Sequence, residues 1–147
     1  MDRVMGAPRV LIVHDQPLVY EGTAEILRRD GGCQVSGRMC HEDQSGPEPL
    51  EPDTDVVVIA FTSGAEPSIE WARTIEHNSS GVGTVVLVGT PTARLLRHIA
   101  HASMCSVLHQ RSSPATLVQA VRAAAIHQRY FCPVVAEALM HVVADGV

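Results

Sequence analysis

The sequence DTDVVVIAFTSG, residues 53–64, contains the segment that decides the fold. Five apolar residues follow Asp55, four of them β-branched, and a polar loop follows Phe61. A short run of this composition, bounded by turn residues, predicts a strand over 55–61 that is buried on both faces, as in the centre of a parallel sheet. Functional groups in such sheets usually lie at the carboxyl ends of the strands. This strand ends instead in Ala60 and Phe61, which carry no reactive group.

The rest of the chain alternates between strand-like and helix-like segments. The sequence predicts further strands at residues 9–14, 33–38, 84–88 and 105–109, and helices that begin near Pro17, Pro67, Pro91 and Pro114. Strands that alternate with helices of this length form right-handed βαβ units, so we expect an α/β fold with a doubly wound parallel sheet. A chain of 147 residues supports one such domain and a short extension.

One connection breaks this alternation. The sequence HEDQSGPEPLEPD, residues 41–53, lies where a helix is due, and it contains Pro47, Pro49 and Pro52. Proline lacks a backbone N–H and clashes with the preceding helical turn, so a regular helix is disfavoured here. We expect a loop or a single turn that covers one edge of the sheet poorly.

The composition argues against several kinds of protein. The net charge is −5, and all 11 cationic residues are arginine. Surfaces that bind nucleic acid are usually basic, so this segment is not expected to bind DNA itself. Neither a membrane-spanning apolar run nor the apolar core of a signal peptide is present. The sequence therefore predicts a soluble, cytoplasmic protein with no membrane partner.

No residue pattern is diagnostic of an enzyme or a metal protein. The sequence GVGTVV, residues 81–86, precedes a strand, whereas a dinucleotide-binding fingerprint follows one. The sets His98, His101 and His109, and Cys33, Cys40 and His41, lack the spacing of a metal site. The cysteines, which also include Cys105 and Cys132, lack CxxC spacing and are expected to be reduced thiols. We expect no enzymatic activity, no metal and no cofactor.

Several segments of the chain resemble one protein family. They are RVLIVHDQPLVYEG at 9–22, DVVVIA at 55–60, TVVLVGT at 84–90, SVLHQRSSPATLVQAVRAA at 106–124 and RYFCPVVAEALM at 129–140. Together they resemble the receiver domain of bacterial response regulators of the NarL/LuxR type, over almost the whole chain. The resemblance implies a flavodoxin-like fold with strand order 2-1-3-4-5, here with a degraded second helix. It also implies a receiver-like domain at 1–130 and, at 131–147, a linker and helix that lead to an absent helix-turn-helix domain.

The resemblance also implies a site for phosphoryl transfer. In this family an Asp at the end of the third strand accepts the phosphoryl group, and two acidic residues after the first strand hold Mg²⁺. A Thr or Ser after the fourth strand and a Lys after the fifth strand contact the phosphoryl oxygens. These positions fall on His14 and Asp15 for the acidic pair, on Ala60 for the acceptor, on Gly89 or Thr90 for the Thr/Ser, and on Gln110 for the Lys.

Three of these groups are missing together. Ala60 cannot carry a phosphoryl group, and Gln110 supplies a dipole where the chemistry needs a positive charge. A lone Asp15 is a poor Mg²⁺ site, because hard cations need several oxygen ligands. We interpret the chain as an actinomycete-like pseudo-receiver that keeps the fold and has lost the phosphorylation switch. His14 and Asp15 then form either a hydrogen-bonded loop pair or a titrating pair.

A small ligand is one candidate for what controls such a domain. The loss of charge leaves Ala60, Phe61, Gly89 and Gln110 near a crevice at the strand ends, the usual position of a ligand in this architecture. Atypical receivers of actinomycete antibiotic pathways, which bind pathway products, are the precedent that the resemblance implies. The alternative is a pocket that side chains close.

A second subunit is the other candidate. Receivers of this family commonly pair through their last two helices and fifth strand, and four arginines lie near that face: Arg94, Arg97, Arg111 and Arg122. The C-terminal segment carries an apolar stripe at helical spacing, formed by Val134, Val135, Ala138, Leu139, Val142 and Val143. This stripe packs either back onto its own domain or onto a second subunit or a downstream module.

These observations favour a phosphorylation-independent regulatory domain of a transcription regulator of antibiotic biosynthesis, acting as a homodimer and binding a small molecule. DNA would then be bound only through the absent C-terminal domain. The alternative is a stand-alone pseudo-receiver that docks on a partner protein without DNA. A residual phosphatase or transferase is a third hypothesis, and the missing Asp and Lys argue against it.

Overall fold

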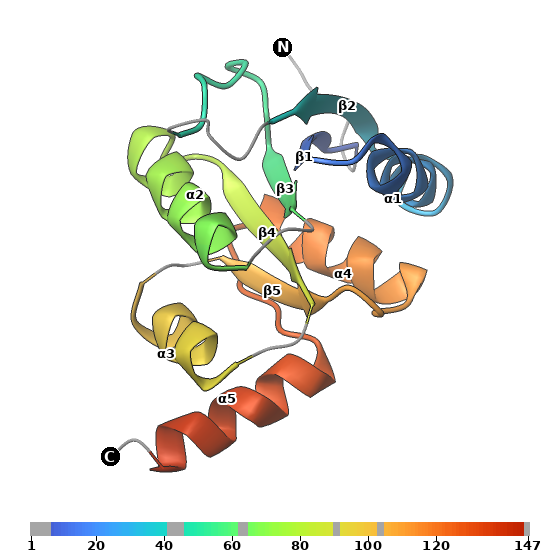
Figure 1. The fold of residues 1–147 in the computed structure, drawn as a ribbon. Coiled ribbons are helices and arrows are strands. Elements are labelled where there is room, and N and C mark those ends of the chain that lie inside the picture. Colours follow the sequence, from blue (N-terminus) through green and yellow to red (C-terminus); the bar gives the residue numbers. More distant parts are fainter. Residues whose placement is uncertain (1–6, 41–45, 62–64, 90–91, 103–104, 146–147) are drawn as a thin grey trace.

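The sheet has the strand order of the flavodoxin-like fold. The computed structural model describes residues 7–40, 46–61, 65–89, 92–102 and 105–145. Its strands are β1 (Arg9–His14), β2 (Gln34–Met39), β3 (Val56–Ala60), β4 (Gly83–Val88) and β5 (Ser106–His109). They pair in parallel in the order β2-β1-β3-β4-β5 (Figure 1). The predicted fold class and strand order are therefore confirmed.

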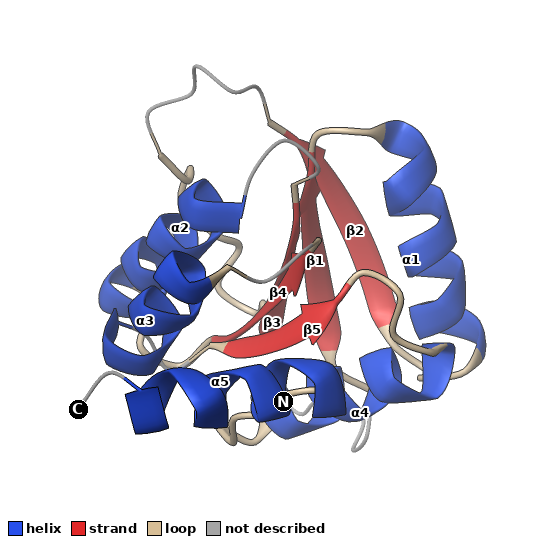
Figure 2. Cartoon of the chain, turned by 60° about the horizontal axis from the view of Figure 1, so that its bottom comes forward, coloured by secondary structure: helices blue, strands red, loops and turns tan. Residues whose placement is uncertain are grey.

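Helices cover both faces of this sheet. They are α1 (Pro17–Arg29), α2 (Ala65–Asn78), α3 (Ala93–Ala102), α4 (Pro114–Ala125) and α5 (Pro133–Asp145). Helices α1 and α4 lie on one face, α2 and α3 lie on the other, and α5 runs beside β5 against α3 (Figure 2). None of the helices in the described part of the chain is long and apolar enough to span a membrane.

Strand β3 forms the centre of the core, as its composition predicts. Each of its residues is at most 2% exposed. Neighbouring strands on both sides satisfy its backbone groups, and helices cover both faces. A β-branched apolar run suits this position because it packs against neighbours above and below the pleated sheet.

Two of the four helix starts lie at the predicted prolines. Helix α1 begins at Pro17, and α4 begins at Pro114 after Ser113, whose hydroxyl oxygen accepts a hydrogen bond from the Thr116 N–H at 3.2 Å. Helix α2 begins two residues before Pro67, which is tolerated because first-turn N–H groups have no intrahelical acceptor. Helix α3 begins two residues after Pro91, since the Thr92 hydroxyl accepts from the Leu95 N–H at 3.1 Å and acts as its cap.

The proline-rich connection forms no helix over residues 46–55, the part of it that the structure describes. Leu50 packs against the core, and the Glu48 carbonyl accepts a hydrogen bond from Arg38 Nη1 at 3.4 Å. Irregular chain thus takes the place of the second helix, which confirms the prediction made from its prolines.

The C-terminal segment attaches to the outer edge of β5. The Val107 N–H donates to the Tyr130 carbonyl at 3.0 Å, and the Cys132 N–H donates to the Val107 carbonyl at 3.3 Å. The α5 side chain of Val135 is fully buried, and Ala138, Leu139 and Val142 pack against the core. These four residues of the apolar stripe therefore pack onto their own domain, one of the two arrangements that the sequence left open, while Val134 and Val143 of the stripe are exposed.

Candidate functional site

The positions of the degenerate phosphorylation site meet at the carboxyl edge of the sheet. His14 and Ala60 are paired residues at the ends of the adjacent strands β1 and β3. At the end of β4, the Val88 carbonyl accepts a hydrogen bond from the Gln110 N–H at 2.8 Å. The Gln110 side-chain oxygen lies 3.7 Å from where a Cβ on Gly89 would stand. Thr90, the alternative Thr/Ser position, lies outside the described residues.

The residue predicted for the acceptor position is a buried alanine. Ala60 is 2% exposed at the end of β3. The next residue, Phe61, is half-buried and contacts Trp71 of α2 edge to face, with ring centroids 5.2 Å apart. Aromatic carbon thus lies next to Ala60, and Ala60 itself carries no nucleophile.

His14 is buried against an aromatic ring of α1. Its side chain is 6% exposed and stacks on Tyr20 of α1, with centroids 5.0 Å apart and planes 18° apart. Its Nδ1 atom is buried and has no hydrogen-bond partner. Asp15, the retained acidic residue, is half-exposed at the start of the following turn. Whether the two residues titrate as a pair stays a prediction.

Tyr20 and Gly37 belong to this site, and the sequence reasoning missed both. A Cβ on Gly37 of β2 would collide with the Tyr20 ring, so glycine leaves the space that the ring occupies. The Tyr20 hydroxyl accepts a hydrogen bond from Arg28 Nη2 at 3.4 Å. The available signal was an aromatic residue in α1 together with a glycine inside the β2 sequence, since a glycine in a strand often marks a close approach.

The other candidate residues that the structure describes were considered in the sequence as metal ligands. Among the described residues, no group of three or more His, Cys, Asp or Glu side chains could hold a metal ion. His109 Nδ1 accepts from the Arg111 N–H at 3.0 Å, and His98 Nδ1 is buried without a partner. The His101 side chain and His41 lie outside the described residues. The four cysteines are buried, and none of them forms a disulfide.

The residues predicted for dimerisation fall into two groups. Arg94, Arg97, Arg111 and Arg122 are exposed. On α5, Val135 is fully buried, while Leu139 and Val142 are half-buried against their own domain. The same helix exposes Met140 to 74% and Val143 to 58%. Met140 was not among the predicted residues, because the sequence pattern alone does not show which flank of a largely apolar helix faces the domain.

Comparison with known proteins identifies the fold. No protein-family model and no curated protein matches the chain. The response regulator ChrA of a heme-sensing two-component system aligns with a TM-score of 0.71 and 23% identity, over 95% of this chain and 67% of ChrA. A LuxR-family response regulator from Aurantimonas sp. SI85-9A1 aligns with a TM-score of 0.72 and 20% identity, over 94% of this chain and 99% of that one.

RcsB, in a structure of two dimers bound to two parallel DNAs, aligns with a TM-score of 0.70 and 17% identity. That alignment covers 91% of this chain and 68% of RcsB. At these identities the likeness establishes the architecture. The chain has the fold of a response-regulator receiver domain.

Proposed function

We propose that the chain is a phosphorylation-independent receiver-like domain of a transcription regulator, which acts by dimerisation and by binding a small ligand. The proposal rests on which residues lie at the carboxyl edge of the sheet. There the receiver positions hold His14, Ala60 and Gln110, in the places of an acidic residue, the acceptor Asp and the Lys.

Phosphorylation independence follows from the charges at this edge. An aspartyl phosphate needs a carboxylate as acceptor, a metal ion to offset the phosphoryl oxygens and a cation to stabilise the product. Ala60 removes the acceptor outright. Asp15 supplies one carboxylate where Mg²⁺ needs several oxygen ligands, and Gln110 carries no charge.

Phosphorylation independence is tested with beryllofluoride, an analogue of the phosphoryl group, and with acetyl phosphate, a phosphoryl donor. We expect that beryllofluoride with Mg²⁺, and acetyl phosphate with Mg²⁺, leave the amide NMR spectrum of the chain unchanged. As a matched control, the triple variant His14→Asp, Ala60→Asp and Gln110→Lys restores the three missing groups and should show shifts at this edge. Shifts of the unmodified chain that cluster at Asp15, Ala60 and Gly89 would contradict phosphorylation independence.

Ligand binding at the same edge is supported by the state of His14. A nine-tenths buried imidazole with an unpartnered Nδ1 is costly, and a hydrogen bond from a ligand would relieve that cost. The carboxyl edge of a parallel sheet is also the usual ligand position in this architecture. The Phe61–Trp71 contact supports the alternative in which side chains fill this space.

Dimerisation is supported by the exposed flank of α5. Met140 and Val143 leave apolar surface on the outer side of a helix whose inner stripe is already buried. Such surface is a frequent contact between subunits. RcsB, a neighbour in fold, forms dimers that bind DNA. We extend that arrangement to this chain as part of the proposal, with DNA bound by a separate domain.

A domain that docks on a partner protein without DNA is the second candidate. Its support is Leu18, in the first turn of α1 and 85% exposed, and Met39, which ends β2 and is 49% exposed. Sedimentation of the chain across concentration separates the two candidates. A dimer that is unchanged by acetyl phosphate and Mg²⁺ supports the first candidate. A chain that stays monomeric at all concentrations supports the second candidate.

A further inference from the structure

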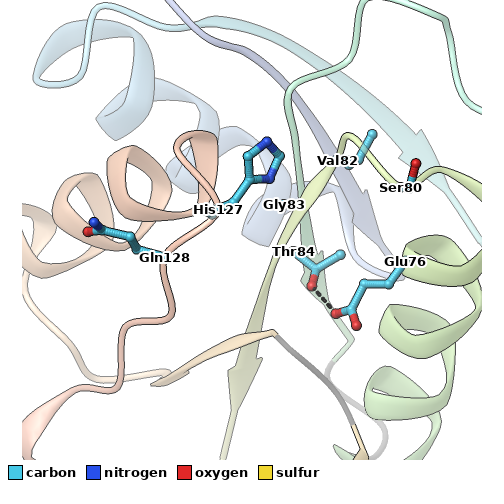
Figure 3. A pocket seen from close by; sticks show the side chains of 8 residues that line it. Glu76, Ser80, Val82, Gly83, Thr84, His127 and Gln128 are labelled. Atoms are coloured by element: carbon cyan, nitrogen blue, oxygen red, sulfur yellow. Dashed lines mark hydrogen bonds between the residues drawn. The ribbon is translucent and has the colours of Figure 1, made fainter.

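A cavity of about 320 Å³ lies at the amino edge of the sheet, opposite to the candidate site (Figure 3). Its walls come from three elements: the end of α2 with the turn after it, the start of β4, and the end of α4 with the turn after it. The volume is in the range of pockets that hold small molecules in proteins. The proposed function makes no use of this cavity.

The lining of the cavity contains one carboxylate and two hydroxyl groups. Glu76 of α2 contributes a carboxylate, and the Thr84 hydroxyl of β4 donates a hydrogen bond to its Oε2 at 2.7 Å (Figure 3). Thr84 is 3% exposed, so its position is set by the core and it holds the carboxylate at the cavity wall. No lysine or arginine is among the lining residues.

Two helix ends add to this negative potential. In a parallel α/β sheet the helices run opposite to the strands, so α2 and α4 both end at the amino edge, one on each face. The carboxyl end of a helix carries a partial negative charge because its last carbonyl groups point outward. A cation in the cavity would therefore interact favourably with Glu76 and with both helix ends.

The base of the cavity is backbone and apolar carbon. A Cβ on Gly83 would collide with the Ala124 carbonyl oxygen, so β4 and the end of α4 are in direct contact there. Val82 and the Ala124 side chain add apolar surface. A ligand that fits this base carries a short apolar group next to its charged group.

His127 forms the wall on the α4 side in a conformation that favours glycine. Its φ angle is +62°, in the left-handed region. The turn is a Schellman motif, in which the His127 N–H donates to the Ala124 carbonyl at 3.0 Å and the Gln128 N–H donates to the Ala123 carbonyl at 2.9 Å. Glycine would make the same turn without strain, so the imidazole stays at an energetic cost and gives the cavity a polar wall.

We propose that this cavity binds a small organic cation, an amine or guanidinium compound with a short apolar group. Glu76 is the charge partner, held by Thr84. His127 lies on the opposite wall, where its imidazole supplies a polar group to the ligand.

The test is an amide NMR titration of the 147-residue chain with benzylammonium, benzyl alcohol and benzoate as probes. Benzylammonium should produce saturable shifts at Gly83, Thr84 and Gln128, with a dissociation constant of about 1 mM or tighter. The neutral and anionic probes should not. Absence of saturation at about 10 mM amine, equal binding of benzyl alcohol, or shifts centred on His14 and Ala60 would each overturn the proposal.

Two variants test the named residues. Glu76→Gln keeps the size of the side chain and should weaken benzylammonium binding about tenfold or more, because it removes the charge partner. Glu70→Gln, an exposed position on the same helix, is the matched control and should leave the affinity unchanged. His127→Gly removes backbone strain, so it should fold at least as well as the parent and still bind the amine more weakly. Equal effects of the two glutamate variants would contradict the role of Glu76.

Discussion

Tyr20 links three elements at the candidate site through its ring. It stacks on His14 of β1, it fills the space above Gly37 of β2, and it belongs to α1. Stacked and offset aromatic contacts are favourable beyond the area that they bury. The ring therefore helps to fix the position of the His14 imidazole, which we proposed to stand in the place of an acidic residue. The site therefore depends on the space that Gly37 leaves in β2 as much as on the His14 side chain in β1.

Two glycine substitutions should have opposite effects on the free energy of unfolding, and the first of them depends on the contact with Tyr20. Gly37→Ala should lower the free energy of unfolding by about 1–3 kcal/mol, because its Cβ collides with the Tyr20 ring and the core must shift. Gly22→Ala, in α1, should raise it by about 0.5–1 kcal/mol, since no atom lies within 4 Å of the new Cβ and alanine favours helix. Urea denaturation measures both. A Gly37→Ala variant as stable as the parent would contradict the close approach.

Helix α5 has an inner and an outer apolar surface. The inner surface, centred on Val135, completes the domain by covering β5 and packing against α3. The outer surface contains Ala136, Met140 and Val143, which are spaced by four and three residues and share one flank. A second subunit can use the outer surface without displacing the inner one. An acidic substitution at Leu139 is therefore a poor test of dimerisation, because that side chain packs on its own domain.

The substitution Met140→Asp tests whether the outer surface of α5 forms the dimer contact. We expect it to convert a dimer to a monomer with little change in stability, because the side chain is 74% exposed and its replacement introduces a charge into the subunit contact. Val134→Asp, at a position 56% exposed on the other side of the inner stripe, is the control and should remain dimeric. Sedimentation velocity across concentration gives the result. A Met140→Asp variant that stays dimeric would exclude the outer surface of α5.

At the scale of the whole molecule, buried thiols should make stability depend on pH. Burial raises the pKa of the thiols of Cys33 and Cys40. The unfolded chain then loses these protons at a lower pH than the folded chain does. The contribution of these thiols to the free energy of unfolding should be fully present below the unfolded thiol pKa of about 9 and be lost as the pH rises above it.

Denaturation in urea at several pH values between about 7.5 and 10.5 checks this dependence. The variant Cys33→Ala and Cys40→Ala is the matched control. It should be less stable at neutral pH, because it leaves small cavities, but its stability should change less with pH. Equal slopes for the parent and the variant would show that other groups, such as tyrosines, cause the decline.

The sequence predicts the order of the elements because each signal for it is local. The β-branched run of β3, the prolines at the starts of α1 and α4, and the prolines of the irregular connection act within a few residues of themselves. The starts of α2 and α3 were displaced by two residues, because a capping side chain at Thr92 and the tolerance of proline in a first turn outweigh the simple rule. The predicted absence of the receiver's acceptor and Lys is also local, since it depends only on which residues end β3 and β5.

The features that only the tertiary structure decided are contacts between parts of the chain that are distant in sequence. The sequence left open whether the C-terminal stripe packs on its own domain, and the hydrogen bonds between Val107 and residues 130–132 now attach that segment to β5. The stacking of Tyr20 on His14 and the cavity between Glu76 and His127 join elements far apart in sequence. Local periodicity is set by neighbouring residues, whereas these contacts arise only when helices and strands pack, and packing is a property of the assembled core.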